Sequence, residues 1–164
     1  MQLSKKWLIA TAISAALLST ISNSSVTRLT SYTQLVQALK NGHRVTSVTE
    51  FKKCTTTGGT PLADEAQFDS VGLSFNQGFF LIQKLPNETQ FSVGTIATNT
   101  IPGKNEGTYN RYKLIRVFED DTATLSAIHS NAVTAKTIGW VEHTCKISQG
   151  NDQNGVSLFD YDAG

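Results

Sequence analysis

The sequence has few of the residues and none of the short motifs that mark catalytic or metal sites. Its 164 residues include two cysteines, Cys54 and Cys145, and three widely separated histidines, His43, His129 and His143. It contains no Gly-x-Ser-x-Gly elbow, no His-Glu-x-x-His and no Gly-x-x-x-x-Gly-Lys-Ser/Thr. We therefore predict no catalytic residue, no cofactor and no metal site, and we expect that the protein is not an enzyme.

An excess of charge of one sign is also missing. The chain has 14 basic and 13 acidic residues. Lys5 and Lys6 are the only charges in residues 1–24, so without that segment 12 basic residues face 13 acidic ones. No stripe of basic residues with interleaved aromatics is present, and we therefore expect no nucleic-acid partner.

Only one long apolar run occurs, the fifteen residues Trp7–Ile21. Lys5 and Lys6 precede it and small polar residues follow, which is the layout of a secretory signal peptide over residues 1–24. The run is shorter than the roughly 20 residues that span a bilayer. We predict cleavage after Ser22 or Ser24, no stable membrane insertion afterwards, and a secreted or periplasmic protein; a retained anchor is the alternative. Residues 25–164 suffice for a single globular domain.

Helix signals are complete between residues 31 and 42. Ser31 is placed as an N-cap, and Gln34 follows at the spacing of a capping box. Asn41-Gly42 supplies a left-handed stop. The apolar residues between these ends share one helix face: Tyr32, Leu35, Val36 and Leu39. A helix this short is marginal alone, so we expect its apolar face to pack on a sheet.

Short segments rich in β-branched and aromatic residues follow, separated by turns. We predict strands over 44–51, 68–75, 78–85, 89–98, 109–119, 122–128, 134–142, 144–147 and 156–161. Residues 55–61, 101–107, 120–121 and 149–155 read as loops or turns. We expect 68–75 and 78–85 to pair with each other. The predicted fold class is α+β, mainly β, with one N-terminal helix packed on an antiparallel meander or a partly closed barrel.

The two cysteines favour a disulfide, because an even count in an exported chain usually forms bridges. One alternative is a metal site that combines Cys54 and Cys145 with Glu142 and His143, although the paired spacing of structural zinc ligands is absent. Free thiols are a further alternative. The loop between the cysteines is long, so a bridge would restrict the unfolded chain strongly.

Two other groups of residues have a functional and a structural interpretation. Glu119, Asp120 and Asp121 form the one acidic cluster, and we interpret it as a solvated hairpin turn rather than a calcium site. Four phenylalanines could line a ligand cavity, but we expect them in the core: Phe75, Phe79, Phe80 and Phe91.

The stretch Leu29–Cys54, with Leu-x-x-Ala-Leu-x-x-Gly at residues 35–42, resembles the VirK protein family. The segment Tyr109–Leu125 is also similar to that family, which usually has Asp-Gly where this chain has Asp120-Asp121. VirK proteins are small exported bacterial proteins associated with virulence. The resemblance implies no enzymatic activity and transfers no catalytic residue.

Two function classes remain. The first is an exported, virulence-associated accessory or interaction protein with an unknown protein partner, which predicts a filled core and an exposed patch. The alternative is a small-ligand or lipid-binding carrier that uses the interior of a curved sheet. The carrier predicts an apolar cavity lined by some of the phenylalanines.

Overall fold

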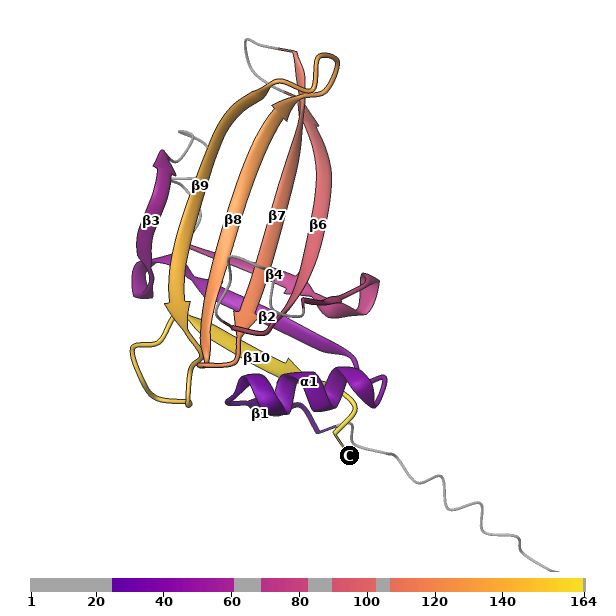
Figure 1. The fold of residues 1–164 in the computed structure, drawn as a ribbon, viewed down its shortest axis with the longest axis vertical. Helices are drawn as coiled ribbons and strands as arrows, with labels where there is room; N and C mark the ends of the chain where they lie inside the picture. Colours follow the sequence, from indigo (N-terminus) through magenta and orange to yellow (C-terminus); the bar gives the residue numbers. More distant parts are fainter. Residues whose placement is uncertain (1–24, 61–68, 83–89, 103–106, 164) are drawn as a thin grey trace, which may run out of the picture.

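The computed structural model describes residues 25–60, 69–82, 90–102 and 107–163. These residues form two antiparallel sheets and one α-helix (Figure 1). The predicted signal peptide, residues 1–24, lies outside them. The fold class is confirmed as α+β and mainly β. Of the two predicted arrangements, the antiparallel meander is the one observed, because the described sheets do not close into a barrel.

The small sheet has the order β1, β10, β2, β4. Its strands are β1 (Thr27–Leu29), β10 (Val156–Asp160), β2 (Val45–Glu50) and β4 (Ser70–Ser74). The large sheet has the order β3, β9, β8, β7, β6, β5. Its strands are β3 (Thr55–Thr60), β9 (Thr137–Lys146), β8 (Thr122–Asn131), β7 (Thr108–Phe118), β6 (Ser92–Pro102) and β5 (Phe80–Ile82).

Helix α1 (Tyr32–Lys40) begins as the sequence predicts. The Gln34 backbone N–H donates to the Ser31 hydroxyl at 3.2 Å. The other half of the predicted capping box is wrong by one residue. The Gln34 side-chain oxygen accepts from the Thr30 backbone N–H at 2.7 Å rather than from that of Ser31. The box still satisfies two backbone donors.

The end of α1 is a Schellman turn. Gly42 has φ +78° and its N–H donates to the Leu39 carbonyl, while the His43 N–H donates to the Ala38 carbonyl. Leu35, Ala38 and Leu39 are buried, as the predicted apolar face requires. The helix therefore covers the core at the end of the molecule where the two sheets meet (Figure 1).

The core lies between α1, the small sheet and one end of the large sheet. From the large sheet it includes Ile115, Val117 and Leu125, all nearly inaccessible to solvent. The other ends of β6–β9 project well beyond the small sheet (Figure 1). We call the two parts of the large sheet the packed end (residues 92–95, 115–118, 122–125 and 143–146) and the projecting end (96–102, 108–114, 126–131 and 137–142).

The disulfide between Cys54 and Cys145 is confirmed. Cys54 follows the short 3-10 helix η1 (Phe51–Lys53), where the chain leaves the small sheet for the large one, and Cys145 lies on β9. The bond therefore fastens the crossing between the sheets.

The prediction of a loop over residues 55–61 is wrong for the part that is described, because Thr55–Thr60 form β3 at the edge of the large sheet. The strand accommodates its glycines through a register shift between Thr56 and Gly58 and a positive φ of +71° at Gly59. Pairing with β9 outweighs the low intrinsic strand preference of glycine.

The predicted pairing of residues 68–75 with 78–85 is also wrong. β4 pairs with β2 in the small sheet, and β5 pairs with β6 in the large sheet. The 3-10 helix η3 (Phe75–Gln77) separates them and inserts Phe75 into the core. Burial of this side chain turns the chain from one sheet to the other. The turn after β6 is shorter than predicted, because β6 continues to Pro102. The turn between β8 and β9 lies three residues later than predicted, because β8 continues to Asn131 and β9 begins at Thr137.

Candidate functional site

An exposed apolar strip crosses the outer face of the large sheet, the face turned away from the core. The strand register places Tyr112 opposite Ile128 and Ile128 opposite Trp140. Ile96 lies opposite Leu114 in the next row. We call these five residues the outer apolar patch. Trp140 is 47% exposed and Ile128 is 37% exposed, so the patch is open to a partner.

Strand alternation explains why these side chains face outward. Ile115 and Ala127 point into the molecule and are buried, so their neighbours Leu114 and Ile128 point to the opposite face. The outer apolar patch therefore belongs to the projecting end. Its residues come from four adjacent strands, β6, β7, β8 and β9.

The indole ring of Trp140 lies against the backbone of β3. A Cβ built on Gly58 would fall 2.6 Å from a carbon of this ring, closer than side chains tolerate. Glycine at position 58 therefore lets the ring approach the edge strand closely. The packing supports one side of the indole and leaves the rest exposed.

Polar side chains that bond to one another border the patch. The Ser126 hydroxyl donates to the Glu142 carboxylate at 3.0 Å, and the Thr100 hydroxyl donates to the Asn110 side-chain carbonyl at 2.9 Å. An apolar, aromatic centre with a hydrogen-bonded rim is the arrangement found in protein interfaces. No charged side chain belongs to the patch itself.

The inner face of the projecting end carries a buried polar row beside the apolar side chains of Ala127 and Val141. Arg111 lies opposite Asn99 on one side and His129 on the other. His129 is fully buried, and its ring stacks with Tyr109 at a centroid distance of 5.4 Å. Arg111 and Tyr109 are also buried, and these three residues make further interactions. The row is an internal polar layer rather than an open site.

The other two histidines lie elsewhere, so the histidines stay as scattered as the sequence predicts. His43 Nδ1 is 2.8 Å from an Asp160 carboxylate oxygen. His143 Nδ1 is 3.2 Å from the Thr56 hydroxyl, and its ring packs on Phe51.

The metal alternative for Cys54, Cys145, Glu142 and His143 is wrong, because both sulfurs are bonded to each other. Glu142 bonds to Ser126 on the outer face, whereas its neighbour His143 lies on the inner side of β9. Within the described residues, no group of three or more potential ligands could hold a metal ion.

The acidic cluster forms the predicted hairpin turn between β7 and β8, and Asp121 adds a function there. Asp121 has φ +64°, and its carboxylate accepts from the Tyr32 backbone N–H at 2.7 Å. This acceptor satisfies an orphan donor of the first turn of α1, where negative charge is favoured. Burial raises the pKa of Asp120, but hydrogen bonds from Thr122 and Gln90 outweigh it, so the pKa is lowered overall.

The prediction that the phenylalanines lie in the core holds for Phe75 and is wrong for two others. Phe79 is 40% exposed and Phe91 is 44% exposed. Phe79 follows η3 in a turn and Phe91 precedes β6, so neither faces a second layer. The side chain of Phe80 is outside the described part of the chain.

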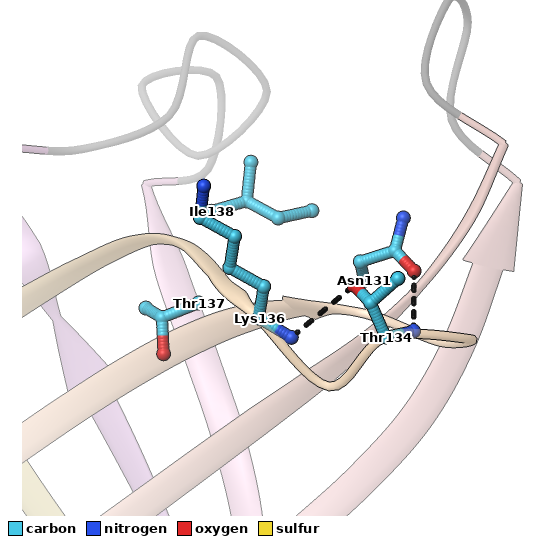
Figure 2. A pocket seen from close by; sticks show the side chains of 5 residues that line it. All are labelled: Asn131, Thr134, Lys136, Thr137 and Ile138. Carbon is cyan, nitrogen blue, oxygen red and sulfur yellow. Dashed lines mark hydrogen bonds between the residues drawn. The ribbon is translucent and has the colours of Figure 1, made fainter.

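A cavity of about 450 Å³ lies at the tip of the β8–β9 hairpin (Figure 2). It is lined by Asn131, Thr134, Lys136, Thr137 and Ile138. The Asn131 side-chain carbonyl accepts from the Thr134 N–H at 2.8 Å, and its backbone N–H donates to the Lys136 carbonyl. The polar groups of this turn thus bond largely to one another. A second cavity, of about 400 Å³, lies beside the end of α1.

These features define a small, disulfide-linked protein with two antiparallel sheets, one capping helix and an exposed sheet face. The VirK protein family matches residues 28–135, more than half of the chain, and the chain therefore belongs to the VirK family. The crystal structure of lpg1832, a VirK family protein from Legionella pneumophila, is similar with a TM-score of 0.61 and 19% identity. The similarity covers 80% of this chain and 98% of that chain. A search of curated proteins finds no match.

Sequence analysis missed the outer apolar patch. In β9, Trp140 and Val141 are both apolar, so strict alternation does not show which one faces the core. Pairing Ile128 with Trp140 would have required the register of β8 and β9, which their sequences do not reveal. The signal that could have revealed the patch is the presence of a second apolar residue on the non-core face of several adjacent strands.

Proposed function

We propose that this VirK family protein is an exported, virulence-associated accessory protein that binds another protein through the outer apolar patch. The observation that carries the proposal is the outward-facing row formed by Tyr112, Ile128 and Trp140 on three adjacent strands, in which Ile128 and Trp140 are exposed and Tyr112 is half-buried. Large aromatic side chains at the centre of a patch are typical binding anchors.

The chemistry of the patch favours a protein with a flat, uncharged apolar surface. The centre offers aromatic and branched aliphatic groups, and the rim offers hydroxyl, amide and carboxylate groups such as those of Thr98, Asn110 and Glu142. A partner with apolar side chains at its centre and hydrogen-bonding groups around them would match this pattern.

Export is supported by the signal-peptide layout of residues 1–24 and by the disulfide, which persists in oxidising compartments. Within the described residues, no helix is long and apolar enough to cross a membrane. We propose that the mature amino terminus lies between Asn23 and Val26, and amino-terminal sequencing of the exported protein would test this.

The carrier alternative, in which a ligand occupies the interior of a curved sheet, has less support. At the packed end, the inner face of the large sheet is filled by core side chains such as Ile115, Val117 and Leu125. The two cavities described above lie at a hairpin tip and beside α1, not in the interior of the sheet. The exposed patch therefore favours the interaction protein.

Site-specific photo-crosslinking tests the proposed interface. Replacing Ile128 with p-benzoylphenylalanine, in the organism that encodes the protein, should give one dominant adduct that excess wild-type protein competes away. The matched control is the same replacement at Thr124, which faces outward four residues away on β8, in a polar row with Arg116 and Thr144. Equal adducts from both positions, or an adduct that persists in a Trp140→Asp background, would refute the proposed interface.

A further inference from the structure

The cavity beside α1 lies where the helix ends and η3 begins, far from the outer apolar patch. Its apolar wall comes from Leu39, Phe75 and Phe79. Leu39 and Phe75 are anchored in the core, whereas Phe79 is partly exposed. A volume of about 400 Å³ is within the range of small-molecule sites.

Two glycines line this cavity. Gly42 and Gly78 both line it with positive φ, and a Cβ built on either residue would meet no atom within 4 Å. The space in front of both backbones is therefore empty of protein. The wall of the cavity thus includes two positions whose backbone conformation favours glycine.

The first polar group on the rim is His43. Its Nδ1 is held by the buried carboxylate of Asp160, which also accepts from the Asp162 backbone N–H at 2.9 Å. Because a carboxylate only accepts, Nδ1 carries the proton in this pair. Nε2 is then the other ring nitrogen, and in the neutral ring it is an acceptor.

The second polar group is Asn76, whose orientation is fixed by the start of β2. Its side-chain oxygen accepts from the Val45 backbone N–H at 2.9 Å. Its amide nitrogen donates no hydrogen bond to any described residue and remains as a donor. Arg44 also lines the cavity and gives Nε and Nη2 to Asp162, which leaves Nη1 as a further donor.

We propose that this cavity binds a small amphipathic carboxylic acid, with its apolar group against Leu39, Phe75 and Phe79 and its carboxylate towards Asn76 and Arg44. The two acidic groups nearby, Asp160 and Asp162, are already bonded to His43 and Arg44. The unbonded donors on this rim are the Asn76 amide nitrogen and Arg44 Nη1, and they complement a carboxylate.

Binding of 3-phenylpropionate, followed by amide NMR of the ¹⁵N-labelled, disulfide-bonded protein, tests the proposal. We expect saturable shifts at Gly42, Asn76 and Gly78, with a dissociation constant on the order of 1 mM for a ligand of about eleven heavy atoms. The neutral 3-phenylpropanamide should bind at least fivefold more weakly, and 3-phenylpropylamine should cause no saturable shift. Equal binding of acid, amide and amine would overturn the proposal, as would no shift at these three residues.

Two variants sharpen the test. Asn76→Asp keeps the oxygen that accepts from Val45 but replaces the donor with negative charge, so binding of the acid should weaken at least tenfold. Phe79→Ala should weaken binding about fivefold to tenfold, whereas Phe91→Ala removes an equally exposed phenylalanine that does not line the cavity and should change nothing. Unchanged binding in Asn76→Asp with an intact spectrum would refute the assigned carboxylate position.

Discussion

The packed end and the projecting end of the large sheet distribute their side chains in opposite ways. At the packed end, Ile115 and Val117 face inward and Arg116 faces outward. At the projecting end of the same strand, Arg111 faces inward, whereas Tyr112 and Leu114 face outward. One strand therefore reverses its polarity along its length.

If the proposed function is correct, the reversal separates the part of the sheet that stabilises the fold from the part that binds a partner. Apolar side chains buried between the sheets stabilise the fold by roughly 25 cal/mol per Å² of apolar surface. Ile128 and Trp140 are 37% and 47% exposed, so they contribute less of this kind than the fully buried core side chains. The fold does not explain an apolar row on the outer face, whereas a binding surface does.

The largest effect at the packed end should come from the disulfide. Replacing both Cys54 and Cys145 with serine should lower the free energy of unfolding by about 4–5 kcal/mol, because the loop between them spans 91 positions. Urea unfolding of this double variant beside the oxidised wild type measures the difference. Superimposable curves would show that the crossing between the sheets holds without the bond.

The next effect concerns the helix that closes the packed end. Leu39→Ala should lower the free energy of unfolding by about 2–5 kcal/mol, because the side chain is buried in the core. Gln37→Ala is the matched control on the exposed face of α1 and should change it by about 0.5 kcal/mol or less. A stable Leu39→Ala beside an unfolded Gln37→Ala would mean that the helix face is wrongly assigned.

The helix and the hairpin turn at the packed end could be predicted from the sequence, because their signals are local. The N-cap at Ser31, the helical spacing of Leu35 and Leu39 and the stop at Gly42 all act within one helix. The hairpin between β7 and β8 is equally local, because Asp120-Asp121 makes its turn. These elements were predicted nearly to the residue.

The edge strand β3, the corner at Phe75 and the outer apolar patch depend on contacts between residues that are distant in sequence. The strand β3 exists because β9 offers an edge to Thr55–Thr60, not because of its own residues. The corner at Phe75 depends on which sheet each neighbouring strand joins. The outer apolar patch likewise requires knowledge that the small sheet stops short of the projecting end (Figure 1).

A moderate effect is expected where the β7–β8 turn meets α1. Asp121→Ala should lower the free energy of unfolding by about 1–2 kcal/mol, because it removes the acceptor for the Tyr32 N–H and places alanine at φ +64°. Asp121→Asn keeps an acceptor oxygen and tolerates this backbone, so it should cost less. Equal losses in thermal or urea unfolding would show that the carboxylate charge is the main contribution.

A smaller, local effect is expected at the chain end beside the small sheet. Hydrogen bonds from the Arg44 side chain and backbone lower the pKa of Asp162 to about 2, against an ordinary value of 3.8. A lowered pKa means that this pair stabilises the fold above pH 3.8 and ceases to do so as the pH falls from 3.8 through 2. Carbon NMR titration of the Asp162 carboxyl should show this low midpoint, and Arg44→Ala should return it towards 3.8.

The smallest effect on stability should come from the projecting end, and it separates the two regions most clearly. Ile128→Ser should change the free energy of unfolding by about 0.5 kcal/mol or less, because the side chain is exposed and lacks a second layer. Trp140 should respond differently, because its ring packs on Gly58 as well as facing solvent. Trp140→Ala should therefore cost more than Ile128→Ser, while both abolish binding of the partner. Urea unfolding and the crosslinked yield from p-benzoylphenylalanine placed at Ile96 of the patch, measured on the same two variants, give the two readouts. If Ile128→Ser destabilised the protein as much as Leu39→Ala, the outer apolar patch would belong to the folding core, and the polarity reversal along the strands would no longer indicate a binding surface.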